Sequence, residues 1–469
     1  MRRFSSSGII LFLILILPLL IFAVTMRQQL VGRAGEVRAR IEIDTQTITG
    51  PLPQTWRALA QGGEVKGERM LANVVPQIME LSPRYIRIDH IYDFYDVVSR
   101  NDGGQLILNW SQLDATVCDI LASGARPFFS LGYMPPALSR DGSLISAPAQ
   151  WGDWQYLVEK TIERYSGRNT VLCGGSINAG IPDIYYEVWN EPDLEVFGKW
   201  SLYGGDKDYK LLYLVSAQGA AAADNVQQYF LGGPATTAPY ANWMKIFLRF
   251  IRENNLRIDF LSWHRYSADP RDFDADTLLV DVWLAEEEFA RYRSLPRIIS
   301  EWGYDAQPNP VSESPMGAAH SVTAIRNLIE QDLEMAFLFE IKDGRTPTWG
   351  ILSSTGTKKL RYHAIKLLDI LGPRRLRLTG EGTYVKAIAS KNTDEVAVIL
   401  VNYDRSQQHQ ETVPVKFNGL TPERNYEMTL IELGGQEQSV VLPASAEGIL
   451  TRLILMKPNS VVGMRLVPR

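Results

Sequence analysis

The chain of 469 residues is too long for one ordinary domain and indicates a large domain accompanied by a smaller one. Hydrophobic residues make up 45% of it and charged residues 22%, which is typical of a globular protein and excludes a low-complexity chain. The net charge is −5 and the basic residues are scattered, which argues against nucleic acid as a partner.

The first predicted element is a hydrophobic segment within residues 1–25. Arg2 and Arg3 precede an uncharged apolar run, Ile9–Val24, which fits either the core of a signal peptide or a short membrane anchor. The pattern of a cleavage site is poor around Ala23, so we expect an uncleaved anchor in preference to a cleaved signal. Either alternative predicts an extracytoplasmic protein, membrane-anchored or secreted, with the membrane as a partner of this segment.

Residues 51–372 alternate β-prone runs with amphipathic helical stretches. The predicted strands are 56–62, 84–89, 126–132, 183–189, 229–234, 258–264, 296–302 and 335–340. The predicted helices are 111–123, 154–165, 207–223, 243–254, 275–293 and 318–333. Eight strands alternating with helices predict an α/β fold, a (β/α)8 TIM barrel, because parallel strands need helical crossovers. An open doubly wound sheet is the alternative, but no Gly-x-Gly-x-x-Gly follows any strand.

From residue 373 onward the pattern changes to short strands separated by Asn, Gly, Pro and Asp turns, such as "EVAVILVNYD" and "ETVPVKFNG". These strands predict a C-terminal β-sandwich domain over residues 373–469. Val37–Gln46 alternates with a period of two and is a candidate extra strand of that sandwich. It lies within residues 26–50, which otherwise form a linker.

Cysteines and histidines give no sign of a metal site. Cys118 and Cys173 are the two cysteines of the chain, and no Cys-x-x-Cys occurs. Export would permit a disulfide, but the sequence does not show that the two residues meet, so two buried free thiols are the default expectation. The five histidines lack zinc-like spacing. We therefore predict no metal and no cofactor.

The ends of the predicted strands hold the candidate chemistry, because active residues of a (β/α)8 barrel lie at the carboxyl ends of its strands. The fourth strand ends in Asn190 and Glu191, within "YYEVWNEPDL", and the seventh ends in Glu301, within "IISEWGY". Glycoside hydrolysis needs two carboxyl groups that flank the scissile bond, one protonated and one ionised. A single glutamate is more often an inert surface residue, but two at strand ends of one barrel predict a catalytic pair.

The motifs at the strand ends resemble glycoside hydrolase family 39, a family of retaining (β/α)8 glycosidases that includes β-xylosidases and α-L-iduronidases. "YIRID", "PFFSLGYMPPAL", "YYEVWNEPDL", "DFLSWHRYS" and "IISEWGY" are similar to the second, third, fourth, sixth and seventh strands of that family. The resemblance extends from about Pro51 to Leu371. It implies that Glu191 is the general acid/base and Glu301 the nucleophile of a double displacement.

The resemblance also implies the residues that bind substrate or support the nucleophile. Asn190 would bond the 2-hydroxyl of the sugar, an interaction that strengthens in the transition state. Tyr266 would hold the nucleophile ionised and aligned, with His264 beside it on the same strand. Arg87 would lie beneath the nucleophile and lower its pKa. The alternatives are a core histidine at His264 and a packing salt bridge at Arg87.

Two strands depart from the pattern of the family. Asp89 and His90 replace the histidine that the xylosidases carry after the arginine of the second strand, which points to a different recognition of the sugar by Asp89. The eighth strand lacks an aromatic-rich ending and offers Glu340, Lys342 and Asp343 instead. These three charges could bind an acidic sugar, but we expect them to pair with one another.

Tryptophans at strand ends are candidate sugar platforms. Trp302 and Trp349 are predicted to bind substrate through their ring faces, as is Trp263, although each could equally belong to the core. We expect an exported retaining glycoside hydrolase that acts on an oligo- or polysaccharide, either xyloside-like or an exopolysaccharide. Two alternatives stay open: a non-catalytic carbohydrate-binding protein, and a transglycosylase that uses the same two glutamates.

Overall fold

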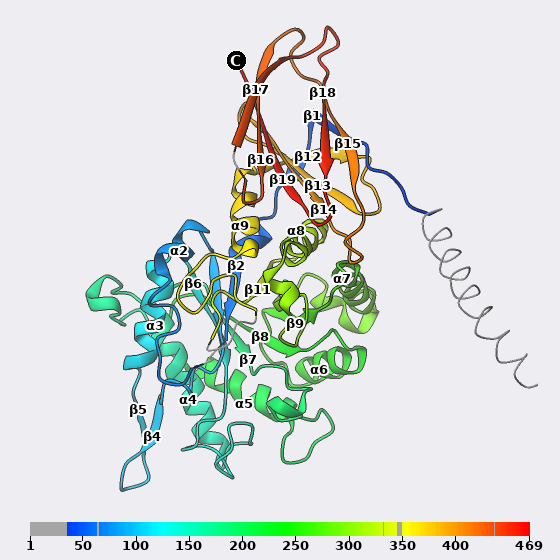
Figure 1. The fold of residues 1–469 in the computed structure, drawn as a ribbon. Coiled ribbons are helices and arrows are strands. Elements are labelled where there is room, and N and C mark those ends of the chain that lie inside the picture. The colour runs from blue at the N-terminus through cyan, green and yellow to red at the C-terminus, as the bar shows by residue number, and fades with distance from the viewer. Residues whose placement is uncertain (1–34, 63–64, 332, 345–348, 436) are drawn as a thin grey trace, which may run out of the picture.

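The computed structural model describes residues 35–62, 65–331, 333–344, 349–435 and 437–469, and consists of a barrel and a strand-rich domain (Figure 1). The hydrophobic run Ile9–Val24 lies outside the described residues. Within the described ranges we find no helix with the length and apolar character needed to cross a membrane.

Eight parallel strands close into a barrel, which confirms the predicted fold class. Their order around the barrel is β10 (Arg297–Gly303), β11 (Met335–Phe339), β2 (Ala58–Gln61), β3 (Tyr85–Ile88), β6 (Arg126–Leu131), β7 (Ile184–Val188), β8 (Tyr229–Thr236) and β9 (Phe260–Tyr266). Each strand lies on one of the predicted β-prone runs. At the amino end of the barrel, inward-facing aromatic rings pack together, among them Phe128, Tyr185, Phe260 and Phe337. This end is therefore a filled floor, and polar side chains are left to the opposite end.

Helices cover the outside of the barrel, mostly where the sequence predicted them. They are α3 (Ser111–Ala122), α4 (Trp151–Ser166), α5 (Tyr209–Ala222), α6 (Ala241–Glu253), α7 (Arg271–Leu284) and α8 (Pro315–Glu330). The stretch expected to be one helix over 275–293 ends as the 3-10 helix η4 (Glu287–Tyr292). Short elements were missed because too few residues show a period: α2 (Val75–Glu80), α9 (Leu360–Leu367), and the hairpin of β4 (Val98–Arg100) and β5 (Leu106–Leu108).

The C-terminal domain is one nine-stranded sheet that folds over on itself. Its strand order is β17 (Glu437–Pro443), β16 (Asn425–Glu432), β19 (Val461–Pro468), β14 (Val396–Asn402), β13 (Val385–Lys391), β12 (Arg374–Thr379), β1 (Ile41–Pro51), β15 (Glu411–Asn418) and β18 (Leu450–Met456). Buried residues of both halves, such as Val398 and Met428 against Ile43 and Val415, share one core, as in a β-sandwich. The early strand β1 pairs with β12 and β15.

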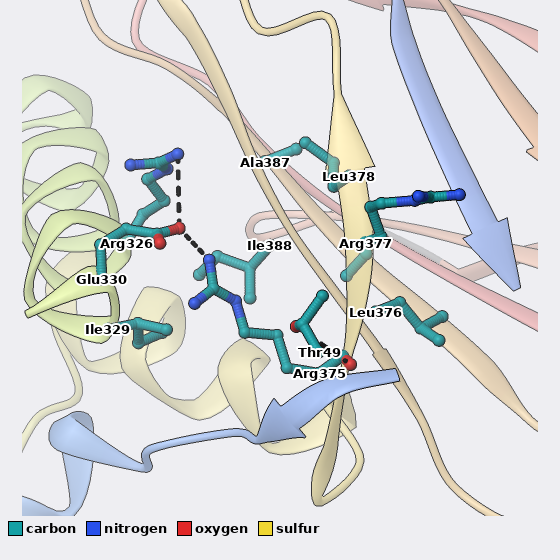
Figure 2. A pocket seen from close by; sticks show the side chains of 11 residues that line it. Thr49, Arg326, Ile329, Glu330, Arg375, Leu376, Arg377, Leu378, Ala387 and Ile388 are labelled. Carbon is teal, nitrogen blue, oxygen red and sulfur yellow. Dashed lines mark hydrogen bonds and ion pairs between the residues drawn. The ribbon is translucent and has the colours of Figure 1, made fainter. Parts of the chain in front are cut away.

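The sandwich rests on helix α8 of the barrel through ion pairs (Figure 2). Arg326 of α8 donates from two guanidinium nitrogens to Glu381, over 2.9 and 2.6 Å. Glu330, one turn further along α8, pairs with Arg375 of β12 and lies 3.5 Å from Arg326. Each domain thus contributes one cation and one anion to the ion pairs that join the two domains.

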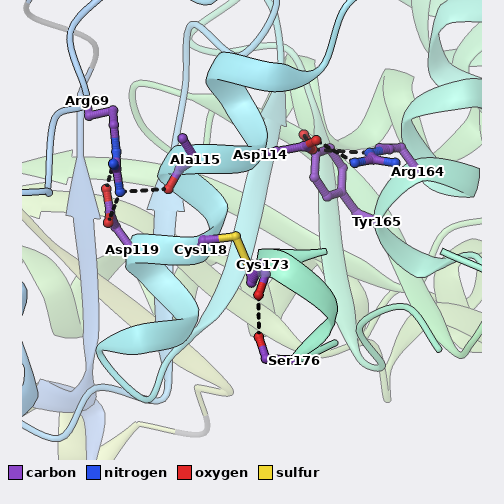
Figure 3. Close-up of a disulfide and its surroundings, with 9 residues drawn as sticks. All are labelled: Arg69, Asp114, Ala115, Cys118, Asp119, Arg164, Tyr165, Cys173 and Ser176. Atoms are coloured by element: carbon purple, nitrogen blue, oxygen red, sulfur yellow. Dashed lines mark hydrogen bonds and ion pairs between the residues drawn. A yellow bond between two sulfur atoms is a disulfide. The ribbon is translucent and has the colours of Figure 1, made fainter. Parts of the chain in front are cut away.

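A disulfide joins Cys118 of α3 to Cys173, so the expectation of two free thiols is wrong (Figure 3). The Cα atoms lie 5.5 Å apart, although 55 positions separate the residues in the chain. The sequence could not show this contact because it depends on how the segment after α4 returns to α3. Close by, the carboxylate of Asp114 in α3 accepts from Arg164 and from the hydroxyl of Tyr165, each over 3.1 Å, which links α3 to α4.

Candidate active site

Two buried glutamates lie together at the carboxyl end of the barrel. Glu301 is part of β10 and Glu191 follows β7, and each is 8% exposed. The register of β9 and β10 sets Glu301 beside His264. One carboxylate oxygen of each glutamate and one ring nitrogen of His264 lie within 4.8 Å of one another. A short separation of this kind is typical of retaining glycosidases, whose carboxyl groups are about 5–5.5 Å apart, whereas inverting enzymes leave room for a water.

The backbone turns sharply between β7 and Glu191. Trp189 has φ 70° and Glu191 has φ 42°, left-handed values that side-chain-bearing residues rarely adopt. Neighbouring elements hold the turn: Ser130 donates to the carbonyl oxygen of Trp189 over 2.8 Å, and the amide of Glu191 donates to the carbonyl oxygen of Ala235 over 3.0 Å. The strain is therefore stabilised from both flanking strands, and the carboxylate of Glu191 enters the mouth of the barrel.

Glu301 accepts hydrogen bonds on both oxygens. The hydroxyl of Tyr266 donates to Oε1, and Nη1 of Arg87 donates to Oε2 over 3.1 Å. Burial raises the pKa of Glu301, while the nearby charges of His264 and Arg87 and the bond from Tyr266 oppose that rise. The pKa of Tyr266 lies well above its ordinary value, because the ring is buried beside Glu301, so its hydroxyl stays protonated and can donate.

Arg87, on β3, combines both roles considered for it from the sequence. It is 1% exposed, contacts Glu301, and forms an ion pair with the fully buried Glu187 through Nε and Nη2, over 2.9 and 2.8 Å. Burial alone would lower the pKa of Arg87, but the carboxylates of Glu187 and Glu301 raise it above its ordinary value. The guanidinium therefore stays charged, and Glu187 balances its charge within the barrel.

Asn190 is fixed from two sides. Its Oδ1 accepts from Nη2 of Arg87 and its Nδ2 donates to the hydroxyl of Tyr133, each over 2.7 Å. An amide nitrogen carries two hydrogens, so Nδ2 keeps a second donor for a ligand. Tyr133 was missed as a site residue, although it follows the third barrel strand in "PFFSLGYMPPAL", and the strand-end rule could have found it.

His264 is fully buried, with Nδ1 at 2.9 Å from Oε1 of Glu191 and 3.8 Å from Oε2 of Glu301. Burial lowers its pKa, but the two carboxylates outweigh that effect, and the pKa of His264 is raised. His264 is therefore buried like a core residue, and it also contacts both glutamates of the site. We predicted no metal, yet among the described residues these three side chains form a group that could hold a metal ion. The positive charge of Arg87 beside Glu301 would oppose a cation there.

Asp89 and Trp349 lie at the carboxyl end of the barrel, where the carbonyl oxygen of Trp349 accepts from the amide of Glu340, the residue after β11. Asp89 follows β3, is mostly buried, and lies 4.0 Å from Nε2 of His90. Trp349 is half-buried, and its Nε1 donates to the carbonyl oxygen of Asp305 over 2.9 Å. Its ring lies 5.6 Å from that of Phe339, at the end of β11. Both residues therefore remain candidates for contact with a sugar.

Trp302 does not line the mouth, and its prediction as a substrate-binding ring is wrong. It is 1% exposed and packs edge-to-face on Phe273 of α7, with ring centroids 5.6 Å apart. Successive side chains of a strand point to opposite faces, so the strand that directs Glu301 inward directs Trp302 toward the helices. Trp263 of β9 is fully buried as well.

The charges that follow β11 have partners on neighbouring elements. Glu340 accepts from Nε2 of Gln61 over 3.4 Å, and Lys342 donates to Oδ1 of Asn73 over 3.1 Å. Asp343 pairs with Lys359. These contacts tie the segment after β11 to its surroundings.

Two buried glutamates at the strand ends of a (β/α)8 barrel are the arrangement that glycoside hydrolysis needs. The model of Glycosyl hydrolases family 39 matches residues 39–433, and the chain belongs to this family of retaining enzymes. It is 27% identical over 360 residues to a β-xylosidase of Caldicellulosiruptor saccharolyticus, covering 69% of this chain and 70% of that one. A β-xylosidase of Geobacillus stearothermophilus is 23% identical over 356 residues, covering 66% of each chain.

Solved structures share the fold across nearly the whole chain. A family 39 enzyme from Xanthomonas axonopodis pv. citri superposes with a TM-score of 0.74 at 20% identity, covering 93% of this chain and 99% of that one. A monomeric β-xylosidase from Caulobacter crescentus gives the same TM-score and identity, covering 92% and 100%. A bacterial orthologue of human α-L-iduronidase gives 0.68 at 17% identity, covering 92% and 84%. At these identities the likeness shows the fold alone.

Proposed function

We propose that the protein hydrolyses β-xylosidic or similar pentosidic bonds by double displacement, with Glu301 as the nucleophile and Glu191 as the general acid/base. The observation that carries this assignment is the proximity of the two carboxylates, which lie within 4.8 Å through one oxygen each. The names of the matched β-xylosidases support the substrate class.

In the first step, an oxygen of ionised Glu301 forms a bond to the anomeric carbon while the bond from that carbon to the leaving oxygen breaks. Glu191 gives its proton to the leaving oxygen, so the aglycone departs as a neutral alcohol. Arg87 and Tyr266 donate to Glu301 and orient its carboxylate for attack. Once the ester has formed, Arg87 keeps the charge of Glu187 as its partner, so no unpaired cation is left buried.

In the second step, ionised Glu191 takes a proton from a water molecule, which attacks the anomeric carbon and breaks its bond to Glu301. Both carboxyl groups return to their starting states. The second amide hydrogen of Asn190 is available to the 2-hydroxyl of the sugar, since Tyr133 occupies only one of the two.

We also propose that the barrel and sandwich work outside the cytoplasm. The run Ile9–Val24 supports export, and the disulfide between Cys118 and Cys173 supports an oxidising compartment. Fractionation of cells that express the full chain, with thiol labelling before and after reduction, tests this placement. A cytoplasmic protein with two reactive thiols would contradict it.

The experiment that tests the function is an assay of the full-length chain on 4-nitrophenyl β-D-xylopyranoside, with the matching α-L-arabinofuranoside and α-L-iduronide as comparisons. We expect release of nitrophenol from the xyloside, retention of anomeric configuration by NMR, and loss of turnover in Glu301→Gln by a factor of about a thousand or more. Full activity of Glu301→Gln would contradict the assigned nucleophile, and inversion would contradict double displacement.

A further inference from the structure

The loop after β9, residues 267–270, is bound by a side chain of the sandwich. Tyr403, the first residue after β14, donates its hydroxyl to the carbonyl oxygen of Ala268 over 2.6 Å. Ala268 lies two positions beyond Tyr266, the residue whose hydroxyl donates to Glu301. Tyr403 is 8% exposed, and burial raises its pKa, so its hydroxyl stays protonated and can donate. The sandwich therefore holds the backbone that carries a partner of the nucleophile.

Helix α8 fixes the same loop at two further carbonyl groups. Nε2 of His320 lies 2.8 Å from the carbonyl oxygen of Ser267, and Nδ2 of Asn327 donates to the carbonyl oxygen of Pro270 over 2.9 Å. Burial lowers the pKa of His320 to about 3, so the ring is neutral and Nε2 carries the hydrogen that reaches Ser267. Three carbonyl groups of one short loop are thus held by side chains, and only the one at position 268 is held from the other domain.

His320 also connects Tyr403 to the loop that follows the nucleophile. The ring of His320 makes edge contacts with Tyr403 and with Tyr304, at centroid distances of 5.5 and 5.1 Å. Tyr304 lies three positions beyond Glu301, just after β10. One buried aromatic cluster therefore joins the sandwich to both loops of the nucleophile site. The pairing of Arg326 with Glu381 fixes the sandwich to α8 at a second point.

We propose that the sandwich domain supports the geometry of the active site, and that Tyr403 is a positioning residue for the nucleophile. Tyr403 fixes Ala268, which keeps Tyr266 at hydrogen-bonding distance from Glu301. The inference rests on the proposed role of Glu301 as the nucleophile. Tyr403 itself touches no substrate; its effect passes through the loop.

The test is Tyr403→Phe in the full-length chain, assayed on 4-nitrophenyl β-D-xylopyranoside. The change removes one hydroxyl and keeps the ring in place. We expect kcat to fall about two- to tenfold, the range that one uncharged hydrogen bond corresponds to, with a smaller change in KM. A looser bond from Tyr266 raises the pKa of Glu301, so the acid limb of kcat/KM moves to higher pH. Tyr266→Phe, which removes that bond outright, moves the limb further in the same direction.

The matched control is Tyr426→Phe. Tyr426 lies in the same sandwich at 6% exposure, and its hydroxyl accepts from the amide of Thr421 over 3.0 Å. Its replacement therefore removes a tyrosine hydroxyl whose hydrogen bond lies within the sandwich and does not reach the barrel. We expect kcat and the pH profile of this variant to match those of the wild-type protein. Amide hydrogen exchange gives a readout without substrate: the amides of residues 267–269 exchange faster in Tyr403→Phe and at the wild-type rate in Tyr426→Phe.

Wild-type kcat, pH profile and exchange in Tyr403→Phe would overturn the inference, as would an equal loss of kcat in Tyr426→Phe. Failure of the proposed function looks different, because the wild-type protein would then release no nitrophenol or Glu301→Gln would remain active. If Glu301→Gln is inactive and Tyr266→Phe moves the acid limb while Tyr403→Phe does not, only the role of Tyr403 fails.

Discussion

Arg87 donates to Oε2 of Glu301 over 3.1 Å from a position where it is also paired with Glu187. A buried cation shared by two buried carboxylates is costly to remove, because both carboxylates then lose their partner. We expect Arg87→Met to lower the free energy of unfolding by about 3–5 kcal/mol and to abolish turnover. Chemical denaturation and an assay on the aryl xyloside measure the two effects.

The double variant Arg87→Met with Glu187→Gln separates these effects. Removing both charges relieves the unpaired carboxylate, so stability should recover in part, but Glu301 still lacks its donor and activity should stay absent. Recovery of activity together with stability would mean that Arg87 serves only the packing of the barrel.

Glu191→Ala should slow the second step more than the first when the leaving group is activated. Nitrophenol departs without a proton, so formation of the ester needs no acid, whereas attack by water needs a base. We expect a burst of nitrophenol followed by slow turnover, and azide should restore turnover with formation of a glycosyl azide. A variant with neither burst nor rescue would count against the acid/base assignment.

The raised pKa of Glu301 has a consequence for stability as well as for activity. A carboxyl group whose pKa is higher in the folded protein binds its proton more tightly there, so its contribution to stability is present below its ordinary value of 4.5 and is lost as pH rises through the folded value. Wild-type protein at neutral pH therefore bears the cost of an ionised buried group that Glu301→Gln avoids. We expect the Tm of Glu301→Gln to exceed that of the wild type at pH 7, with a difference that shrinks below pH 4.5. An equal difference at both pH values would show that ionisation is not its source.

Loss of the disulfide should affect stability and leave the chemistry intact. Cys118 and Cys173 close a loop of 55 positions on the outer side of the barrel. Such a cross-link stabilises a protein by about 2–4 kcal/mol because it restricts the conformations of the unfolded chain. The double variant Cys118→Ser with Cys173→Ser should melt at a lower temperature. Its kcat at a temperature where it remains folded should equal that of the wild type, and a large drop in kcat would place the disulfide in the catalytic machinery.

Trp302 and Trp349, both predicted from the sequence as sugar platforms, should behave differently. Trp302→Ala leaves a cavity beneath α7 and should cost about 3–5 kcal/mol of stability. Trp349→Ala removes a half-buried ring at the carboxyl end of the barrel, so we expect a raised KM with a smaller loss of stability. Thermal melting and initial rates measure these effects. A raised KM with little loss of stability in Trp302→Ala would show that Trp302 does bind substrate.

The sequence revealed those features that depend on local pattern. The barrel strands follow from short β-prone runs, and the strand-end rule selected Glu191 and Glu301, which the structure brings together. Features that depend on the path of the chain in space were beyond it. The disulfide of Cys118 is one, because its partner arrives through an irregular segment. Tyr403 is another, since no periodicity in a strand indicates which loop of another domain it meets.

Strand alternation explains the one site residue that was misplaced. The sequence places Trp302 beside Glu301, and adjacency in a strand means opposite faces of the barrel wall. Tyr266 and His264, two positions apart on β9, face the same way, and both lie against Glu301: Tyr266 donates to it and Nδ1 of His264 lies 3.8 Å from it.

The aromatic rings that fill the amino end of the barrel close that end to solvent. Phe128, Phe260 and Phe337 are fully buried and fill the end of the barrel opposite the mouth. Among the described residues, access to Glu301 is therefore from the mouth side. In the proposed intermediate, the sugar bound to Glu301 therefore lies between the ester bond and the solvent at the mouth. Under the proposed mechanism, water for the second step enters from the mouth, on the side from which the aglycone has left. An alcohol present in the mouth at that stage then competes with water for the sugar.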